Sequence, residues 1–402
     1  MMPTEVNAGT IRTAAGNGDC GATGDGALAV AACLNEPKGV TIDGQGNLLI
    51  ADSENHLVRK VDRATGLIAT IAGCAGALEP RLEVVKPGPA PEGDNDDPFS
   101  DAGTMGERAF AQQTDLSGTV RYVVNGAGVV KRFGGDGGSA GQAFLNFPTA
   151  VAVDGAGHVY IADTMNHRVR RVEAGTGVIT TIAGVGQPRF GGDGGPAVAA
   201  GLNEPAALAV DERGTLYIAD QSNNRVRAID LSTGIIRTIA GTGSAAYDGD
   251  GMKATEASLA GPSGLALGPD GTLYIADTFN GRIRAVHPVS GVLSTVAGDG
   301  GEYRYQGAVE PPSTSLSRPS GIALDAAGNL FITDSDNHLV RRWDRANGRL
   351  ERLAGVGVAN FGGDGGTALE ASLNYPFGIA LNREGHVFIA DTFNHRIREI
   401  IL

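Results

Sequence analysis

Short apolar runs, separated by turns that contain glycine, recur along most of the chain. Residues 202–241 show one unit, with the runs AALAVD, LYIAD, RVRAID and IIRTIAG in succession. Runs of this length between turn residues are typical of β-strands, and the alternation in RVRAID marks a strand with one buried face. The pattern therefore predicts four short antiparallel strands in each unit.

The unit occurs six times. Each copy contains IAD or ITD, and the six matched aspartates are Asp52, Asp163, Asp220, Asp277, Asp334 and Asp391. The last five follow one another at 57 residues, whereas the first interval is 111 residues, so one unit carries a long insertion. Repeated four-stranded units that close into a ring form a β-propeller, which leaves no long strand edge exposed.

The two ends of the chain predict how this ring closes. The sixth unit stops after its third strand, and residues 10–16 (TIRTAAG) match the missing fourth strand IIRTIAG. We therefore expect an all-β fold, a six-bladed β-propeller of four-stranded antiparallel blades whose last blade is completed by the N-terminal strand. Residues 1–402 form a single propeller on this interpretation, and residues 74–132 are an insertion in the connection from blade 1 to blade 2.

Composition and charge narrow the class of function. The net charge of −13 repels phosphate backbones, so we expect no nucleic-acid partner. No apolar stretch approaches the roughly 20 residues of a membrane span, and no signal segment opens the sequence. A cytoplasmic protein follows from the sequence as written, with an exported mature form as the alternative. The three cysteines (Cys20, Cys33 and Cys74) are too few for a disulfide framework, and Cys20 and Cys33 read as small buried residues or a local pair.

The repeated motif P-x-G-[IVL]-A-[VL]-D…G-x-[LV]-[YF]-I-A-D-x-x-N-x-[RL]-[VI]-R resembles the NHL repeat, and the segment FGGDGG is similar to bacterial NHL proteins. The resemblance covers the chain outside roughly residues 74–132 and implies the propeller fold. It implies no single function, because the fold hosts protein binders, RNA binders, lyases and lactonases.

Residues that recur in every blade are expected to build the blade. Each blade aspartate is followed by an asparagine three residues later and an arginine four residues after that, which predicts a turn held by an Asp–Arg pair. A second set of aspartates, in the GGDGG-type loops, is expected to cap short helices, with an ion-binding ring as the alternative: Asp25, Asp136, Asp193, Asp250 and Asp364. Four histidines at one loop position are expected to hydrogen-bond a turn rather than hold a metal: His56, His167, His338 and His395.

Functional side chains are expected where the repeat is broken, beside the proline that begins each innermost strand. The residues before it are Glu36, Phe147, Glu204, Gly261, Arg318 and Tyr375, and those after it are Lys38, Thr149, Ala206, Ser263, Ser320 and Phe377. Carboxylates, cations and aromatic rings around one opening suit a polar organic ligand with an apolar body. We assign Lys38, Arg318, Phe147, Tyr375 and Phe377 to ligand binding and Glu36 and Glu204 to catalysis; the alternative is a solvated rim of salt bridges.

The long insertion and the possible metal ligands are the remaining features of the sequence. The insertion is expected on the same face as this opening, as a lid or a wall, and its aspartates (Asp94, Asp96, Asp97 and Asp101) lack the spacing of an EF-hand loop. No residue after a blade proline is histidine, so the zinc site implied by a resemblance to amidating lyases is not expected. The resemblance to gluconolactonase-like propellers implies that a divalent metal such as calcium is possible. Its candidate ligands are Glu36, Glu204 and the asparagines Asn35, Asn146, Asn203 and Asn374.

The favoured function is a binding module whose partner on the funnel face is a small-molecule ligand or a protein. The alternative is a small-molecule enzyme, a lyase or a hydrolase, with its active site in the axial funnel and Glu36 or Glu204 as base or metal ligand. We expect a monomer.

Overall fold

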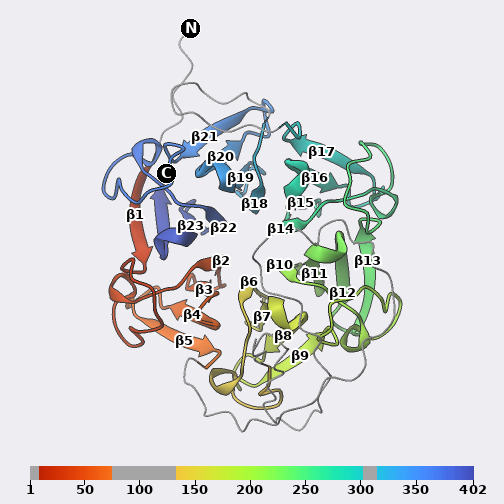
Figure 1. The fold of residues 1–402 in the computed structure, drawn as a ribbon, viewed down its shortest axis with the longest axis horizontal. Helices are drawn as coiled ribbons and strands as arrows, with labels where there is room; N and C mark the ends of the chain where they lie inside the picture. Colours follow the sequence, from red (N-terminus) through yellow and green to blue (C-terminus); the bar gives the residue numbers. More distant parts are fainter. Residues whose placement is uncertain (1–8, 75–132, 302–314) are drawn as a thin grey trace, which may run out of the picture.

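The computed structural model describes residues 9–74, 133–301 and 315–402, which form a ring of six four-stranded antiparallel sheets (Figure 1). Blades 1 to 3 contain, from the axis outward, β2 (Pro37–Ile42), β3 (Leu48–Asp52), β4 (Leu57–Val61) and β5 (Ile68–Ala72); β6 (Pro148–Val153), β7 (Val159–Asp163), β8 (Arg168–Val172) and β9 (Ile179–Ala183); β10 (Pro205–Val210), β11 (Thr215–Asp220), β12 (Arg225–Asp230) and β13 (Ile235–Ala240). Blades 4 and 5 contain β14 (Pro262–Leu267), β15 (Leu273–Asp277), β16 (Arg282–Val286) and β17 (Leu293–Ala297); β18 (Pro319–Leu324), β19 (Leu330–Asp334), β20 (Leu339–Trp343) and β21 (Leu350–Ala354). The predicted six-bladed propeller is confirmed.

Blade 6 closes the ring with strands from both ends of the chain. It contains β22 (Pro376–Leu381), β23 (Val387–Asp391), β24 (Arg396–Ile401) and, outermost, β1 (Thr10–Ala15). β1 pairs antiparallel with β24, with Thr10 opposite Ile401 and Arg12 opposite Glu399. Figure 1 shows the N-terminal strand beside the C-terminal blade, so the predicted closure by the N-terminal strand is also confirmed.

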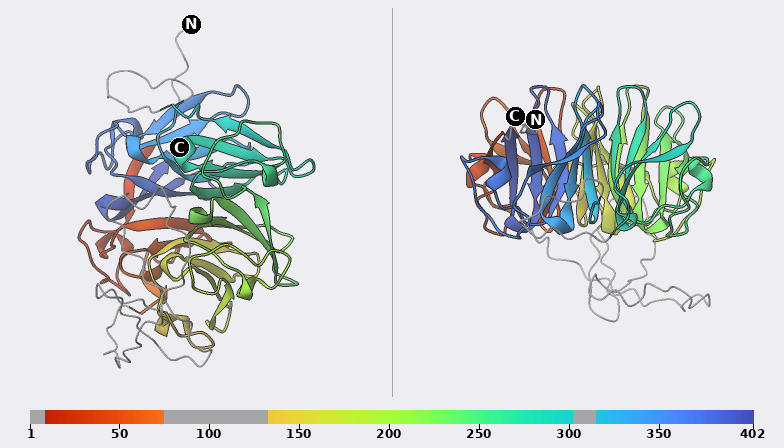
Figure 2. Two further views of the ribbon diagram at one scale, coloured as in Figure 1. Left: turned by 45° about the vertical axis from the view of Figure 1, so that its right-hand side comes forward. Right: turned by 90° about the horizontal axis from the view of Figure 1, so that it is seen from above.

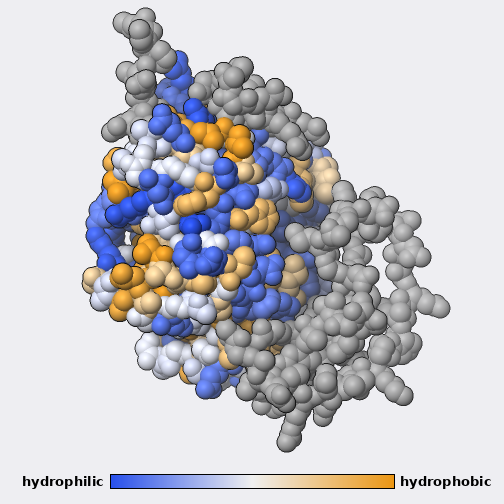
Figure 3. Space-filling view, turned by 60° about the vertical axis from the view of Figure 1, so that its left-hand side comes forward, coloured by the Kyte–Doolittle hydropathy of each residue, from blue (hydrophilic) through white to orange (hydrophobic). Residues whose placement is uncertain are grey.

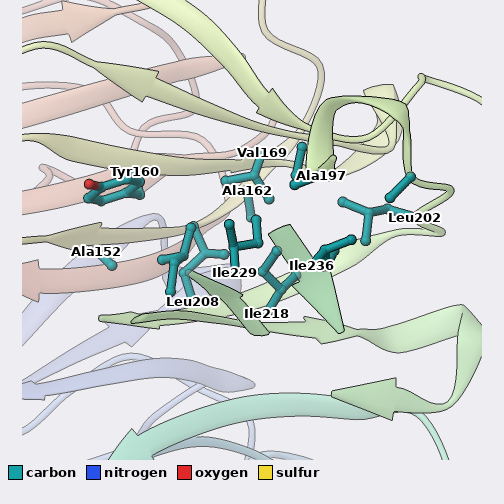
Figure 4. Close-up of a cluster of buried hydrophobic side chains, with 13 residues drawn as sticks. Ala152, Tyr160, Ala162, Val169, Ala197, Leu202, Leu208, Ile218, Ile229 and Ile236 are labelled. Carbon is teal, nitrogen blue, oxygen red and sulfur yellow. The ribbon is translucent and has the colours of Figure 1, made fainter. Parts of the chain in front are cut away.

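The hydrophobic core lies between the blades rather than inside one of them. Between blades 2 and 3, Tyr160, Ala162 and Val169 face Leu208 and Ile218 (Figure 4). Both faces of each sheet are apolar because each is covered by a neighbouring blade, and burying a side chain such as Leu208 contributes about 1.5–3 kcal/mol. The ring is therefore stabilised by six interfaces of the same kind.

A buried polar unit fixes the connection between the second and third strands of each blade. In blade 3, the carboxylate of Asp220 accepts hydrogen bonds from the backbone N–H of Asn203 (2.7 Å), from Asn223 (2.9 Å) and from Arg227 (3.2 Å). Arg227 is fully buried, as are its equivalents Arg59, Arg170, Arg284, Arg341 and Arg398. A buried charge is tolerated only when it is paired and hydrogen-bonded, which explains why all three residue types recur in every blade. The predicted Asp–Arg pair is confirmed.

The GGDGG-type loops correct one expectation. Asp193 does not cap a short helix; it accepts hydrogen bonds from Arg227 (2.6 Å) and from Thr238 in the outermost strand (2.7 Å). Gly192 has φ +87°, and a Cβ there would lie 2.7 Å from the Cα of Ala200, so only glycine fits this turn. The same Asp–Arg contact joins Asp25 to Arg59, Asp136 to Arg170, Asp250 to Arg284 and Asp364 to Arg398. These aspartates hold the loop against the blade that follows it.

The same loops cover the outer edge of the ring. Isolated bridges join Leu28 to Leu67, Ser139 to Val178, Pro196 to Ile235 and Lys253 to Val292, which places each loop beside the outermost strand of its blade. This contact shields an edge that would otherwise be open to pairing with another chain. Figure 3 shows the outside of the ring at blades 1 and 6, where apolar and polar side chains are mixed in small patches. No helix among the described residues is long and apolar enough to cross a membrane.

Candidate functional site at the mouth of the funnel

In each blade the innermost strand begins, and the second strand ends, on the same face of the ring. Figure 2 shows the ring from the side, with connecting loops on two opposite faces. We define the mouth as three residues of each blade on this face: the residue before the blade proline, the residue after it, and the second residue after the blade aspartate. The third set, which the sequence analysis missed, is Glu54, Met165, Ser222, Phe279, Asp336 and Phe393. It could have been found as the more variable of the two positions between the constant aspartate and asparagine, since the other is serine or threonine in five blades.

The residue before each blade proline has an unusual backbone conformation. Its φ is positive in all six blades, from 45° at Glu36 to 56° at Tyr375. Only blade 4 has glycine there (Gly261), although this left-handed region is costly for other residues. A following proline also favours extended backbone at this position. The other five blades hold Glu36, Phe147, Glu204, Arg318 and Tyr375 in this conformation. Side chains that are kept despite a backbone cost are candidates for function.

The loop histidines fix this conformation from the preceding blade. The Nδ1 atoms of His56, His167, His338 and His395 accept hydrogen bonds from the backbone N–H groups of Phe147, Glu204, Tyr375 and Glu36 at 3.0–3.1 Å. In blade 3 the side-chain oxygen of Asn224 accepts the equivalent bond from Gly261. Burial lowers the pKa of His338 and His395, in agreement with a neutral ring that accepts at Nδ1. The predicted turn-side role of these histidines is confirmed.

The position after the proline is occupied by paired hydroxyl groups in three blades. Thr149 pairs with Thr164 (2.7 Å), Ser263 with Thr278 (2.5 Å) and Ser320 with Ser335 (2.9 Å). Blades 1, 3 and 6 depart from this pattern with Lys38, Ala206 and Phe377. Two of these three departures, Lys38 and Phe377, lie in adjacent blades and contact each other.

Lys38 lies in a cage of three phenylalanine rings. Its Nζ atom is 4.8 Å from the ring centre of Phe377, 5.4 Å from that of Phe147 and 5.8 Å from that of Phe393. These distances allow cation–π attraction to each ring. The residue is 8% exposed, and burial lowers the pKa of Lys38 while the neighbouring Glu36 and Glu54 oppose that shift. Within the described part of the chain, no oxygen accepts a hydrogen bond from this ammonium group.

Two carboxylates lie near this cage. Glu36 belongs to the mouth of the same blade, and Glu54 lies on the loop after β3. Partial burial, and then the neighbouring Glu36, raise the pKa of Glu54, although the residue as a whole is exposed. Glu54 is therefore a mouth carboxyl group whose pKa is raised by its surroundings, and it was not among the residues predicted from the sequence.

Glu204 lies in blade 3, with blade 2 between it and Glu36. Its carboxylate accepts a hydrogen bond from Ser222 (2.6 Å). Glu204 and Glu36, both of which are described in the structure, make no hydrogen bond to each other. The two residues proposed for catalysis therefore do not form an acid–base pair.

Arg318, in blade 5, is a second cationic group at the mouth. It donates to the Tyr375 hydroxyl (3.3 Å), lies 3.9 Å from the carboxylate of Asp336 and faces the ring of Phe279 at 5.1 Å. Tyr375 packs on Phe393 with a ring separation of 5.3 Å. Arg318, Tyr375, Phe393 and Lys38 thus follow one another across blades 5, 6 and 1, and three of them (Arg318, Tyr375 and Lys38) were predicted from the sequence.

Below the mouth, a cavity of ≈ 260 Å³ lies on the ring axis. It is lined by the innermost strands of all six blades, and the lining includes one branched residue from each: Val40, Val151, Leu208, Leu265, Ile322 and Ile379. These six side chains belong to the hydrophobic clusters between the blades, and the surface that the cavity exposes is mostly polar.

The comparisons with known proteins agree with this architecture. The NHL repeat profile matches residues 34–61, 145–172, 316–343 and 373–400, and the teneurin NHL domain profile matches residues 186–246 and 242–287. NHL repeat-containing protein 2 of Gallus gallus is 28% identical over 293 residues, which are 65% of this chain and 40% of that protein. The chain belongs to the NHL-repeat family.

The NHL propeller also matches part of a longer plant protein. Protein SUPPRESSOR OF QUENCHING 1, chloroplastic, of Arabidopsis thaliana is 31% identical over 280 residues, 66% of this chain and 26% of that protein. The chain thus spans between about a quarter and two fifths of the length of these curated relatives.

Solved structures show the same fold. A protein of unknown function from Bacteroides thetaiotaomicron gives a TM-score of 0.61 at 18% identity, covering 97% of this chain and 74% of that one. An auxiliary nutrient binding protein from the same organism gives 0.59 at 16% identity (97% and 76%), and a gluconolactonase from Xanthomonas campestris gives 0.52 at 15% (98% and 98%). At these identities the likeness is one of fold alone.

The NHL propeller also brings Cys20 to the edge of the mouth, which corrects its predicted burial. Cys20 is exposed and unpaired, and its Sγ lies 3.2 Å from Nε2 of His395. Because Nδ1 of His395 accepts from Glu36, the proton of the neutral ring is on Nε2 and is donated to the sulfur. His395 therefore cannot take a proton from Cys20, and the pair is not a nucleophile with its base.

Metal ligands do not converge within the described residues: no group of three histidine, cysteine, aspartate or glutamate side chains is placed to hold an ion there. The asparagines that the sequence leaves open as metal ligands (Asn35, Asn146, Asn203 and Asn374) donate their backbone N–H groups to the blade aspartates. Residues 75–132, which include Asp94, Asp96, Asp97 and Asp101 and the predicted lid, lie outside the described residues.

Proposed function

We propose that the mouth of this NHL propeller binds a small organic ligand that carries an anionic group on an apolar body. The observation that supports this most directly is Lys38, a nearly buried ammonium group ringed by three phenylalanines with no described acceptor. A buried charge without a partner is costly, and a carboxylate of a ligand would supply the missing acceptor.

The surroundings of Lys38 favour a ligand with an apolar part. The rings of Phe147, Phe377 and Phe393 surround the ammonium, so ligand atoms next to its anionic group would contact carbon on that side. Sites for small organic ligands commonly combine an apolar lining with a few polar groups that fix orientation.

Arg318 gives the ligand a second point of contact. Its side chain is 49% exposed, and its guanidinium is held by Tyr375 and lies near Asp336, so it is oriented without being saturated. A ligand that spans the face of Tyr375 and Phe393 reaches both cations. Removing either cation is therefore expected to weaken binding without abolishing the fold.

Simple probes test this proposal. We expect 3-phenylpropionate to bind at least about tenfold more tightly than 3-phenylpropan-1-ol or 3-phenylpropylamine, measured by calorimetry or by ligand-observed NMR; a tenfold change is about 1.4 kcal/mol. Lys38→Met keeps the volume of the side chain and removes the charge, so the preference for the anion should disappear. Equal binding of the three probes to the wild-type protein would contradict the proposal.

The relatives guide the proposal only weakly. One structural relative is described as an auxiliary nutrient binding protein and another as a gluconolactonase, and each shares the fold alone with this chain. A protein partner on the same face, and a lyase or hydrolase activity in the funnel, remain separate predictions. The small-ligand proposal is preferred because Lys38 specifies a chemical group.

A further inference from the structure

Blade 6 has aromatic residues at all three mouth positions: Tyr375, Phe377 and Phe393. We call these three rings the aromatic platform. The other five blades have at most one aromatic residue at the same positions. The two blades that pack against blade 6 each contribute a cation to the mouth, Lys38 from blade 1 and Arg318 from blade 5 (Figure 1). An apolar surface therefore lies between two positive groups.

We propose that the ligand of the mouth is a dianion whose flat apolar body lies on the aromatic platform, with one anionic group at Lys38 and the other at Arg318. This inference rests on the proposed function, which assigns one anionic group to Lys38, and it adds a second group at the opposite end of the ligand. The class of ligand is thus narrowed to dicarboxylates and related molecules that are anionic at both ends.

Contacts through the aromatic platform join the two cations. The Nζ atom of Lys38 lies 4.8 Å from the ring centre of Phe377 and 5.8 Å from that of Phe393. The ring of Phe393 is 5.3 Å from the ring of Tyr375, whose hydroxyl group accepts a hydrogen bond from Arg318 (3.3 Å). Phe393 is exposed and Tyr375 is half-buried, so a ligand can reach both rings. One body can therefore cover the platform and end at a cation on each side.

Arg318 is oriented by its neighbours and keeps donors for a ligand. Its guanidinium faces the ring of Phe279 at 5.1 Å, and its Nε atom lies 3.9 Å from the carboxylate of Asp336. The Tyr375 hydroxyl donates to the same carboxylate. The Arg318 side chain is half-exposed, and the N–H groups of a guanidinium form a fork that fits a carboxylate. Asp336 offsets part of the charge of Arg318, so the second anionic group should contribute less to binding than the first.

The acidic residues of blade 1 restrict where the second anionic group can lie. Glu36 and Glu54 are close enough to Lys38 to favour its charged form. They would repel two anionic groups placed together at Lys38, and this repulsion weakens with distance. A second anionic group is therefore placed more favourably at Arg318 than beside the first, which requires the two groups to lie at opposite ends of the ligand.

A series of dicarboxylates tests the inference. 1,4-Phenylenediacetate, 1,4-phenylenedipropionate and 1,4-phenylenedibutyrate keep one flat ring and separate the carboxylates by increasing distances. Calorimetry on the full chain compares each with 3-phenylpropionate at one ionic strength. We expect affinity to pass through a maximum in this series, with the best dicarboxylate binding about tenfold more tightly than 3-phenylpropionate. About twofold of this reflects its two equivalent ends, and about fivefold reflects the pair with a half-exposed arginine.

Two further comparisons isolate the charge at Arg318. The monoamide of the best dicarboxylate should lose the fivefold part of the gain, because a neutral amide does not form an ion pair. Arg318→Met should reduce the ratio of dicarboxylate to monocarboxylate affinity to the statistical factor of about two. Arg345→Met is the matched control, because exposed Arg345 is paired with Asp270 (3.4 Å) on the face opposite the mouth. The two substitutions change the net charge equally, and only the first should change the ratio.

The outcomes separate this inference from the proposed function. If 3-phenylpropionate binds more tightly than 3-phenylpropan-1-ol but no dicarboxylate exceeds the statistical factor, the second anionic group is wrong and the first stands. The second group is equally overturned if the monoamide binds as tightly as the dicarboxylate, or if the gain survives Arg318→Met in a variant that melts like the wild type. If 3-phenylpropionate shows no preference over its alcohol, the proposed function fails, and this inference fails with it.

Discussion

The buried Asp–Arg units and the mouth occupy equivalent places in all six blades, yet they differ in every physical respect. In the units, residue type is constant, the guanidinium groups are fully buried, and each carboxylate accepts several hydrogen bonds. At the mouth, residue type changes from blade to blade, the backbone is held in a left-handed conformation, and Lys38 lacks an acceptor among the described residues.

This difference separates residues that stabilise the ring from residues that are candidates for binding a partner. A saturated, repeated polar unit is what a fold needs wherever a charge must be buried. A strained or unsaturated group that appears in one blade does not help that blade to fold, so it is a candidate for interaction with something outside the chain.

The largest effect is expected in the buried units. Arg227→Ala leaves the carboxylate of Asp220 buried without its cation, and we expect a loss of about 3–5 kcal/mol in the free energy of unfolding. Urea denaturation measures it. As a control, Asp193→Asn alters a loop carboxylate that is 38% exposed and should cost no more than about 1 kcal/mol. Similar losses for the two variants would show that the buried unit is not the special element.

A smaller effect on stability is expected for the aromatic ring that stacks on Arg225, the first residue of the third strand in blade 3. Phe190 stacks on Arg225 with a separation of 3.7 Å, and blades 1 and 5 have leucine in place of this arginine (Leu57 and Leu339). Arg225→Leu should therefore be accepted by the fold at a cost of about 1 kcal/mol. A double-mutant cycle with Phe190→Ala measures the coupling, and independent effects of the two changes would show that the stacking contributes nothing.

The mouth is expected to respond in the opposite direction. Glu36 has φ +45°, and its side chain makes no recorded hydrogen bond in the described structure, whereas blade 4 has glycine at this position. Glu36→Gly relieves the left-handed backbone, so stability should stay the same or rise by up to about 1 kcal/mol. Glu212→Gly, at an exposed turn position, serves as a control for the general effect of glycine. A clear loss of stability in Glu36→Gly alone would place Glu36 among the building residues.

The smallest effect concerns pH. The fold lowers the pKa of His395 from its ordinary value of 6.5, so its contribution to stability is complete above that pH and is lost as the pH falls below it. His395→Asn imitates Asn224, which makes the same hydrogen bond without titrating. The melting temperature of the variant relative to wild type should therefore rise between pH 7 and pH 5. A constant difference would show that His395 does not titrate with folding.

Most of the fold could be predicted from the sequence because the six copies of the repeat can be aligned with one another. The matched aspartates located every second strand, and TIRTAAG at the N-terminus located the closing strand. The role of Asp193 could not be predicted, because its partner Arg227 is distant in sequence and reaches it only once the blade is formed. Local pattern suggested a helix cap, and the tertiary contact overrode it.

The site was predicted in part. Residues flanking the blade prolines do lie at one opening, and Lys38, Phe147 and Phe377 do meet. Glu54, Phe279, Asp336 and Phe393 were missed, because they stand one strand later in the chain and return to the same face only through the turn of each blade. Glu36 and Glu204 were predicted as alternatives at the equivalent position of two blades, and their catalytic role stays a prediction.

The free energy of unfolding of Lys38→Met, measured without ligand, tests the central claim most directly. If Lys38 is kept for a ligand, replacing an unpartnered buried ammonium by an apolar side chain of similar volume should leave stability unchanged or raise it by about 1–3 kcal/mol. A loss of more than about 1 kcal/mol would show that the phenylalanine cage stabilises the fold through Lys38, and the division between building residues and mouth residues would be wrong.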